Sequence, residues 1–401
     1  MWWWFVDRDQ MKNKIKVIQI AHASHSYFAN EKDSVKSIVL NDWYFKVAKQ
    51  LKKFYPKIEV ECWAPEKTNE KYEEFYESGI KLRFFPTTFS PRYALDFSIS
   101  MLKELKKEIE KSKKQNYKLI LHLHEIHNLH SLLIATIFKN EKIVVQHHGG
   151  SWPLKHLKEN KKFKIFFPFF FLGQLWENKI LKNVDCFFAL SQEEINYLKK
   201  NAPNSKIKFQ TMGIEDEYFK RQDKKEARKK LNLSGKKLII FLGRVSETKG
   251  ISYLIEAMKK LPDVELKIMG YGKERKKFEN RIREDNLKNV EFLGGIFGKK
   301  KLLYLSAADA FILPSSKEGA PVTIMEAMAK NLPIIATNVG GISLMIEDGK
   351  NGIIIPPKSP KEIVKAVKEI LKWKNKNIKK YANVYKWKKI IDCTVKEYLQ
   401  K

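Results

Sequence analysis

Two glutamates flank a turn in the stretch SSKEGAPVTIMEAMA, residues 315–329, of a chain that is otherwise rich in lysine. Glu318 stands among loop-forming residues, and Glu326 stands in a run, 322–329, that is typical of a helix. Pro321 fits the first turn of that helix, where its missing N–H would have no partner. The helix N-terminus between the carboxylates offers N–H groups and a partial positive charge, which suit an anion. Either glutamate taken alone is better explained as a solvated surface acid on a helix.

Two basic residues lie in the turn GRVSETKG, residues 243–250, which precedes the glutamate segment in the sequence. Gly243 ends a predicted strand, and Arg244 and Lys249 lie five residues apart before a predicted helix. Arginine offers a planar fork and lysine a point charge, so the two can converge on one polyanion. The order of residues is not that of a Walker A loop. The alternative interpretation is ordinary surface charge before a helix.

Histidines concentrate in the first half of the chain, in HLHEIHNLH and QHHG. The first run holds His122, His124, His127 and His130, and the second holds His147 and His148. His122 and His124 are expected on one face of a strand, because side chains alternate along strands. No carboxylate or cysteine pattern completes a metal site, so we predict no metal and interpret these as hydrogen-bonded or cleft-lining histidines.

Composition limits the classes of partner. The 401 residues carry a net charge of +31, which favours nucleic acid, anionic lipid or a phosphorylated substrate. Lysine-rich composition alone explains the charge as well, and no nucleic-acid-binding motif is found, so we predict no nucleic-acid partner. Three widely spaced cysteines are typical of a reducing, cytoplasmic compartment. No apolar stretch reaches the length of a spanning helix, which needs about 20 residues.

Strand-like and helix-like patterns alternate twice along the chain, which predicts two doubly wound α/β units. Ligands bind outside the carboxyl ends of the strands in such sheets, and two units in one chain suggest a cleft between them. The predicted strands cover 14–22, 58–65, 80–86, 117–125, 142–149, 184–191, 236–244, 264–272, 289–295, 309–315, 332–341 and 352–357. The predicted helices include 37–55, 95–114, 249–261, 273–286, 298–308 and 322–329.

The order and spacing of GRVSETKG, NVEFLGG and the long segment around SSKEGAPVTIMEAMA closely resemble retaining GT-B glycosyltransferases of family 4. The match is strong over about 238–357, and Glu318 and Glu326 correspond to that family's E-x7-E motif. The resemblance implies an α/β GT-B fold with two Rossmann-like domains facing across a cleft. We expect an N-terminal extension at 1–10, an acceptor-binding domain at 11–205, a nucleotide-sugar-binding domain at 206–375, and a helical segment at 376–401 that packs back on the first domain.

By the same resemblance, Glu318 holds the hydroxyls of the donor sugar and Glu326 those of the ribose. Arg244 and Lys249 neutralise the leaving diphosphate, and His148 is the active-site histidine, with His147 left open because the register is uncertain by one residue. We thus expect catalytic roles for Arg244, Lys249, Glu318 and His148. We expect donor binding by Gly243, Gly319, Ala320, Val322, Thr323 and Glu326.

Two features depart from the family pattern. No glycine follows the first predicted strand, where the family approaches the phosphates, and Ser24 or Ser26 would have to substitute. The segment after Gly340 and Gly341 lacks the usual Pro-Glu pair, although both glycines remain and would let backbone come close to a ligand.

The implied activity is transfer of a sugar, of hexosyltransferase type, from a nucleotide-sugar to a lipid-linked or polysaccharide acceptor. Retention of configuration and no cofactor or metal are expected. A non-catalytic sugar-nucleotide- or membrane-binding protein of the same fold is the alternative, and an epimerase or phosphorylase is a third. Residues 155–179 mix lysines with aromatics. They predict peripheral attachment to the cytoplasmic face of an anionic membrane, unless they form a buried core segment.

Overall fold

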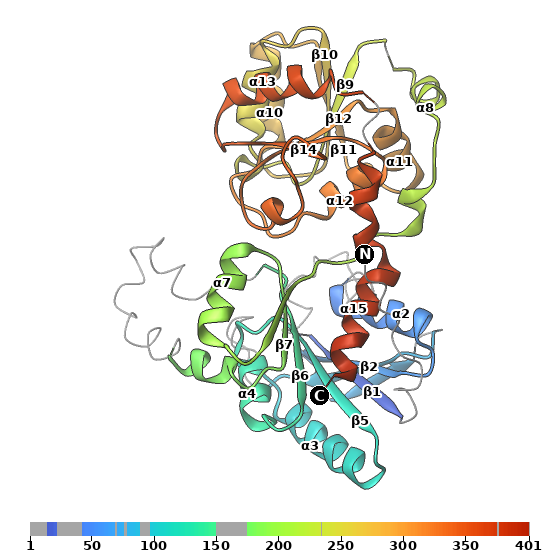
Figure 1. Ribbon diagram of the computed structural model, residues 1–401, viewed down its shortest axis with the longest axis vertical. Helices are drawn as coiled ribbons and strands as arrows, with labels where there is room; N and C mark the ends of the chain where they lie inside the picture. The colour runs from blue at the N-terminus through green and yellow to red at the C-terminus, as the bar shows by residue number, and fades with distance from the viewer. Residues whose placement is uncertain are drawn as a thin grey trace. The chain divides into compact units, whose positions relative to one another are not determined.

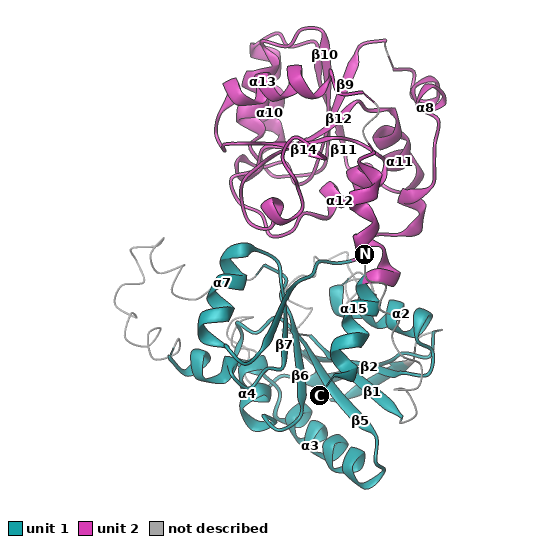
Figure 2. Cartoon of the chain, viewed as in Figure 1, with its two compact units in different colours: residues 1–212, 390–401 teal, residues 213–389 magenta. Residues whose placement is uncertain are grey.

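A computed structural model describes residues 14–21, 42–68, 70–75, 78–88, 97–149, 175–233, 235–374 and 377–400. The predicted extension at 1–10, Ser24, Ser26 and most of the segment 155–179 lie outside these ranges. The chain divides into one compact unit of residues 1–212 with 390–401 and a second of residues 213–389 (Figure 2). The division expected from the sequence lay between residues 205 and 206.

The first unit is built on an eight-stranded sheet in the order β3-β4-β2-β1-β5-β6-β7-β8 (Figure 1). All its neighbouring strands pair in parallel except β3 and β4. β1 is buried along its whole length and lies inside the sheet, between β2 and β5. The strands are β1 (Ile15–Ile20), β2 (Glu59–Glu66), β3 (Tyr72–Phe75), β4 (Lys81–Pro86), β5 (Lys118–His124), β6 (Lys142–Gln146), β7 (Cys186–Ala189) and β8 (Lys206–Phe209).

Four helices of this unit begin at a side chain that accepts a hydrogen bond from a backbone N–H of the first turn, the usual N-cap arrangement. They are α2 (Trp43–Phe54), α3 (Ile99–Lys114), α4 (Leu129–Ile137) and α7 (Gln192–Asn201), capped by Asp42, Ser98, Asn128 and Ser191. Each lies between two strands in the chain. The expectation of a doubly wound α/β unit is therefore confirmed.

The last helix, α15 (Trp387–Leu399), begins in the second unit, and its residues from Ile390 on belong to the first. Tyr55 donates a hydrogen bond of 2.6 Å to Asp392, and Gln210 donates one of 2.9 Å to Thr394. Tyr398 is fully buried. This helix thus supplies part of the core of the first unit.

The second unit is a six-stranded, wholly parallel sheet in the order β11-β10-β9-β12-β13-β14 (Figure 1). The strands are β9 (Lys237–Leu242), β10 (Val264–Met269), β11 (Val290–Gly294), β12 (Ala310–Leu313), β13 (Ile334–Thr337) and β14 (Gly352–Ile355). The α-helices are α8 (Lys224–Lys230), α9 (Ile251–Met258), α10 (Arg275–Glu284), α11 (Gly298–Ala307), α12 (Val322–Ala329), α13 (Pro360–Ile370) and α14 (Lys379–Ala382). Short 3-10 turns are η5 (Asp216–Phe219), η6 (Glu247–Lys249), η7 (Ile342–Leu344) and η8 (Asn383–Tyr385).

Two strands were not predicted from the sequence. β3 has the sequence YEEF and pairs antiparallel with β4, so the first sheet is not parallel at this edge, unlike the parallel sheet that alternating strands and helices predict. Edge strands carry charged side chains that discourage further pairing, which hides them from a search for apolar alternation. β8 has the sequence KIKF and begins at residue 206, where the sequence predicted a domain boundary and no strand.

Among the helices within the described ranges, none has both the length and the apolar character needed to cross a bilayer.

Candidate functional site

The predicted donor-site residues lie at the point where the second sheet reverses its winding. β9 and β12 are neighbours at the centre of the sheet, with β10 and β11 on one side and β13 and β14 on the other. Arg244 follows β9 by two residues, and Glu318 follows β12 by five. The crevice outside the carboxyl ends at such a switch point is where open α/β sheets bind ligands.

Glu318 and Lys249 form an ion pair between the two loops that leave these central strands. The Lys249 Nζ lies 2.6 Å from Glu318 Oε1, and the side chains are 19% and 7% exposed. Ser315 donates a second hydrogen bond, also of 2.6 Å, to the same carboxylate oxygen. The sequence motif did not reveal this pairing, because the two partners are 69 residues apart. The pair fixes both side chains at the carboxyl edge of the sheet.

Close backbone packing holds the Glu318 loop in place, and two glycines permit it. Gly250 has φ +74°, and a Cβ there would lie 2.0 Å from the Pro314 carbonyl oxygen. Gly340 has φ +59°, and a Cβ there would lie 2.0 Å from the Glu318 carbonyl oxygen. Only glycine fits both the positive φ and the contact. The sequence predicted close approach of Gly340 to a ligand, whereas the close contact in the structure is with the backbone of Glu318.

Glu326 is buried in the second turn of α12 and has two partners from other elements. Lys301 of α11 donates a hydrogen bond of 2.9 Å to Glu326 Oε1. Tyr218 of η5 is also hydrogen-bonded to Glu326, and burial together with this carboxylate raises the pKa of Tyr218. The Lys301 Nζ lies 5.0 Å from the centre of the Tyr218 ring. Neither partner was predicted, since Lys301 is one of three consecutive lysines and nothing in the sequence distinguishes it.

A cavity of about 290 Å³ opens beside this carboxylate at the carboxyl ends of β9, β10 and β11. Five of the ten predicted site residues line it: Gly243, Arg244, Val322, Thr323 and Glu326. The other lining residues are Leu242, Gly270, Tyr271, Gly295, Ile296, Phe297 and Lys301. The structure therefore brings Arg244 and Glu326 to one cavity, with the Lys249–Glu318 pair at the same edge of the sheet and outside the cavity lining.

The first turn of α12 has no side-chain cap and lies beside the cavity at the carboxyl edge of the sheet. Pro321 occupies the N-cap position with φ −70°, one residue before the first turn in which the sequence placed it. Its side chain makes no capping hydrogen bond. The amides of Val322 and Thr323 begin the helix beside the cavity, where they favour an anion. Ala320 is buried and Gly319 is partly buried in the preceding turn.

His148 lies in the first unit, two residues after β6, in a chain of hydrogen-bonded side chains. Its Nε2 is 2.9 Å from His124 Nδ1, and the two rings stack with centroids 5.1 Å apart. His124 Nε2 is in turn 2.6 Å from Gln19 Oε1. The edge of Trp43 contacts His148, with ring centroids 4.6 Å apart. His122 stacks on His124, as expected for two residues on one strand face.

His147 faces the interior instead. Its Nδ1 lies 2.6 Å from Glu194 and 3.2 Å from Glu125, and the ring is fully buried. Burial opposes protonation, but Glu194 and Glu125 outweigh it and raise the pKa of His147 to about 10. An imidazolium held between two carboxylates cannot face a ligand. The geometry therefore favours His148, which is partly exposed, as the histidine available to a substrate.

Glu125 completes a group that the histidine pattern did not reveal. Ligand atoms of Glu125, His127 and His147 all lie within 4.8 Å of one another. The expectation that no carboxylate accompanies these histidines is thus wrong, because Glu125 adopts φ +80° just after β5 and turns back toward them. Burial alone would raise the pKa of Glu125, yet His147 lowers it well below its usual value. Opposite charges within the group thus stabilise each other.

His130 gives the first unit a predictable sensitivity to acid. Its ring is fully buried in α4, and burial lowers its pKa from 6.5 to about 3. Between these two pH values the unfolded chain binds a proton that the folded chain does not, so stability falls as the pH falls, by about 1.4 kcal/mol per pH unit for this group. We expect His130→Leu to reduce the loss of unfolding free energy between pH 6.5 and pH 5, measured by urea denaturation. An unchanged loss would contradict a neutral His130.

Two family models together match most of the chain. The model described as Glycosyltransferase Family 4 matches residues 45–218, and the model described as Glycosyl transferases group 1 matches residues 223–387. The chain belongs to the glycosyltransferase family whose two domains these models describe. The predicted resemblance is thereby confirmed, including the first half, for which the sequence motifs were weak.

Individual relatives have low sequence identity to this chain. An uncharacterised glycosyltransferase of Methanocaldococcus jannaschii is 30% identical over 165 residues, which cover 40% of this chain and 47% of the relative. The chain spans about half the length of the curated relatives that it matches first. Sucrose-phosphate synthase from Thermosynechococcus elongatus superposes with a TM-score of 0.67 at 19% identity, covering 96% of this chain and 98% of that one. Anabaena HepE in complex with UDP gives a TM-score of 0.67 at 15% identity, covering 95% and 99%. The two α/β units, with one wholly and one mainly parallel sheet, are those of the GT-B fold.

Proposed function

We propose that this glycosyltransferase family member moves a sugar of hexose type from a nucleotide-sugar to a lipid-linked or polysaccharide acceptor, with retention of configuration and without a metal. The observation that carries the proposal is the placement of Arg244, the Lys249–Glu318 pair and Glu326 around the switch point of one sheet. These groups match the two needs of such a donor, which are cations for a diphosphate and acceptors for sugar hydroxyls. HepE, which has the same fold, is known in complex with UDP.

In the proposed reaction, the bond between the anomeric carbon and the diphosphate oxygen breaks, and its electron pair stays on the diphosphate. Arg244, Lys249 and the α12 amides stabilise the negative charge that develops there, more in the transition state than in the bound donor. The acceptor oxygen bonds to the carbon from the face that the diphosphate leaves. Its proton passes to the departing diphosphate oxygen, so no separate base is required.

Glu318 has a defined role in this scheme. Its Oε1 already accepts from Lys249 and Ser315, so Oε2 is the oxygen that can accept from donor-sugar hydroxyls. Glu326 accepts from the ribose hydroxyls in the neighbouring cavity, oriented by Lys301. His148 serves as the active-site histidine near the sugar, with His124 as its hydrogen-bonded neighbour.

A panel of UDP, GDP and ADP sugars tests the proposal. A donor that binds only the folded chain raises the midpoint of thermal unfolding. Release of free nucleoside diphosphate on addition of a membrane extract then shows transfer, and EDTA leaves the rate unchanged. Donor binding without release would favour the alternative, a non-catalytic sugar-nucleotide-binding protein. Strict dependence on Mg²⁺ or Mn²⁺ would contradict the metal-free mechanism.

We also propose peripheral attachment to the cytoplasmic face of an anionic membrane through residues 155–179, which would bring the enzyme to a lipid-linked acceptor. This segment lies mostly outside the described residues, and the proposal rests on its mixture of lysines and aromatics. Each basic residue near such a surface contributes about 1 kcal/mol.

We expect co-sedimentation with anionic vesicles that falls with added salt and weakens when Phe169, Phe170 and Phe171 become serine. Circular dichroism of the triple variant must match the parent. Equal binding to neutral and anionic vesicles, or binding to neither, would leave the charge of +31 without a membrane partner.

A further inference from the structure

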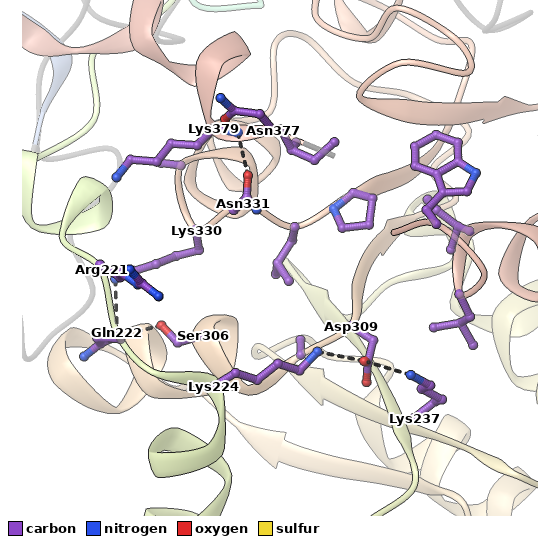
Figure 3. A pocket seen from close by; sticks show the side chains of 18 of the residues that line it. Arg221, Gln222, Lys224, Lys237, Ser306, Asp309, Lys330, Asn331, Asn377 and Lys379 are labelled. Carbon is purple, nitrogen blue, oxygen red and sulfur yellow. Dashed lines mark hydrogen bonds and ion pairs between the residues drawn. The ribbon is translucent and has the colours of Figure 1, made fainter. Parts of the chain in front are cut away.

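A second cavity of about 760 Å³ lies in the second unit, at the opposite edge of the sheet from Arg244 and Glu318 (Figure 3). Lys237 is the first residue of β9, Asp309 directly precedes β12, and Pro333 directly precedes β13. The cavity is therefore formed at the amino ends of the strands. We call it the amino-edge pocket, and it shares no lining residue with the cavity beside Glu326.

The charged side chains of the amino-edge pocket are almost all cationic. One carboxylate lines it, that of Asp309, and this carboxylate is saturated. Lys224 lies 2.7 Å from it, Arg228 3.0 Å and Lys237 3.6 Å, and the Leu238 N–H donates to it at 2.8 Å. The six cationic residues of the lining are Lys220, Arg221, Lys224, Lys237, Lys330 and Lys379.

Lys330 and Lys379 differ from the ordinary surface lysines of this chain. Both are partly buried, and within the described residues each bonds to neutral oxygens and to no carboxylate. Lys330 donates to the Lys220 carbonyl at 3.0 Å and to Gln222 Oε1 at 3.2 Å, and Lys379 donates to the Phe219 carbonyl. Burial, followed by the charge of Lys379, lowers the pKa of Lys330. The charge of Lys379 therefore disfavours the charged form of Lys330, and the more weakly acting Glu217 offsets this in part.

The neutral groups of the pocket also present donors. Gln222 Oε1 accepts from both Ser306, at 2.6 Å, and Lys330, so its NH₂ group is what it can offer to a ligand (Figure 3). Arg221 adds a planar fork at the same rim (Figure 3). Forked guanidinium and ammonium donors around a concave site match the oxygens of a phosphate.

We propose that the amino-edge pocket binds a small phosphorylated anion that carries at least two negative charges, held by Lys330, Lys379 and Arg221. The ligand offsets the like charge of the two lysines and accepts from donors that, within the described residues, form no ion pair with a carboxylate. This site goes beyond the proposed sugar transfer, since it lies at the other edge of the sheet. The phosphate can belong to a soluble molecule or to a lipid headgroup.

The test measures binding of inorganic pyrophosphate to the full chain by calorimetry at constant ionic strength. We expect saturable binding that becomes weaker by about tenfold or more in Lys330→Gln with Lys379→Gln, because charge-assisted bonds are lost. The matched control replaces two exposed lysines of the same unit, Lys260→Gln with Lys288→Gln, and removes the same charge. It should bind as the parent does.

Arg244→Ala separates this pocket from the donor site, since pyrophosphate could also occupy the place of a donor diphosphate. Binding that depends on Lys330 and Lys379 should persist in Arg244→Ala, whether or not that variant transfers sugar. Loss of all pyrophosphate binding in Arg244→Ala, with none lost in the lysine variant, would overturn the proposal.

Stability without ligand gives a second, independent sign. Lys379→Gln should raise the midpoint of thermal unfolding in the absence of pyrophosphate, because it removes a like charge beside Lys330, and should reduce the rise that pyrophosphate causes in the parent. If the lysine had only a structural role, its replacement would lower the unfolding midpoint without ligand.

Binding to vesicles that contain phosphatidic acid distinguishes the two sources of phosphate. Lysine-dependent binding to the vesicles alone identifies the ligand as a lipid headgroup, and lysine-dependent binding to pyrophosphate alone identifies it as a soluble molecule. Lysine-independent binding to both, or binding to neither, overturns the proposal.

Discussion

Replacing Arg244 or Lys249 by alanine should lower the rate of sugar transfer by about two orders of magnitude or more, as removal of one preorganised donor to a developing anion does elsewhere. Arg244 is exposed at the rim of the cavity, so its loss should leave stability unchanged. The measurement is release of nucleoside diphosphate at saturating donor. Lys260→Ala, which removes an exposed lysine of the same unit, should retain the parental rate.

The Lys249 variant needs a further control, because its partner Glu318 is only 7% exposed. Alanine at 249 leaves that carboxylate buried without its cation, which also costs stability. Comparing Lys249→Ala with Lys249→Arg at a temperature where both are folded separates the two effects. Arginine keeps the charge and should restore part of the rate. Parental transfer by Arg244→Ala and Lys249→Ala would show that the diphosphate lies elsewhere.

Changing the two glutamates should divide the kinetic constants between them. Glu326→Ala should mainly raise the KM for the donor, because the ribose contacts are made equally in the ground state and the transition state. Glu318→Ala should mainly lower kcat, because in the proposed function Glu318 contacts the hydroxyls of the reacting sugar. Each loss corresponds to a charge-assisted bond of about 1.5–3 kcal/mol. Initial rates over a donor series measure both constants.

Isosteric variants sharpen this division. Glu326→Gln keeps a hydrogen-bond acceptor but loses the charge that attracts Lys301, and should fall between the parent and Glu326→Ala. Lys301→Ala should reproduce the rise in KM in part, since it acts through the orientation of Glu326. If all three variants keep the parental KM, Glu326 does not contact the donor.

The positions of Glu318 and Glu326 on either side of a helix N-terminus could be predicted because both depend on local sequence. Glycine, proline and the apolar run 322–329 determine that turn and helix within fifteen residues. The same holds for β9 and β12, whose apolar runs end directly before the loops that carry Arg244 and Glu318. The central strands and the carboxyl edge therefore follow from short patterns.

The partners of these residues could not be predicted in the same way. Lys301 reaches Glu326 from a different helix, and Glu194 reaches His147 from α7, 47 positions along the chain. These pairs depend on how helices cross the sheet, which no local period records. β3 and β8 were missed for a related reason: each is four residues long and charged, and each is a strand only because a neighbour supplies its hydrogen bonds.

The membership of residues 390–401 in the first unit has a consequence for the order in which the protein can be made. Ribosomes synthesise residues 1–212 first and residues 213–389 next. The first unit therefore cannot complete its core with residues 390–401 of α15 until the whole of the second unit has been synthesised. Until then the hydroxyl of Tyr398 cannot meet His122, its 2.5 Å partner on β5. The nascent first unit therefore lacks these partners of His122 and Gln210 throughout synthesis of the second. Deleting residues 390–401 should thus make the first unit, and not the second unit that adjoins the deletion in sequence, a target for chaperones and proteases.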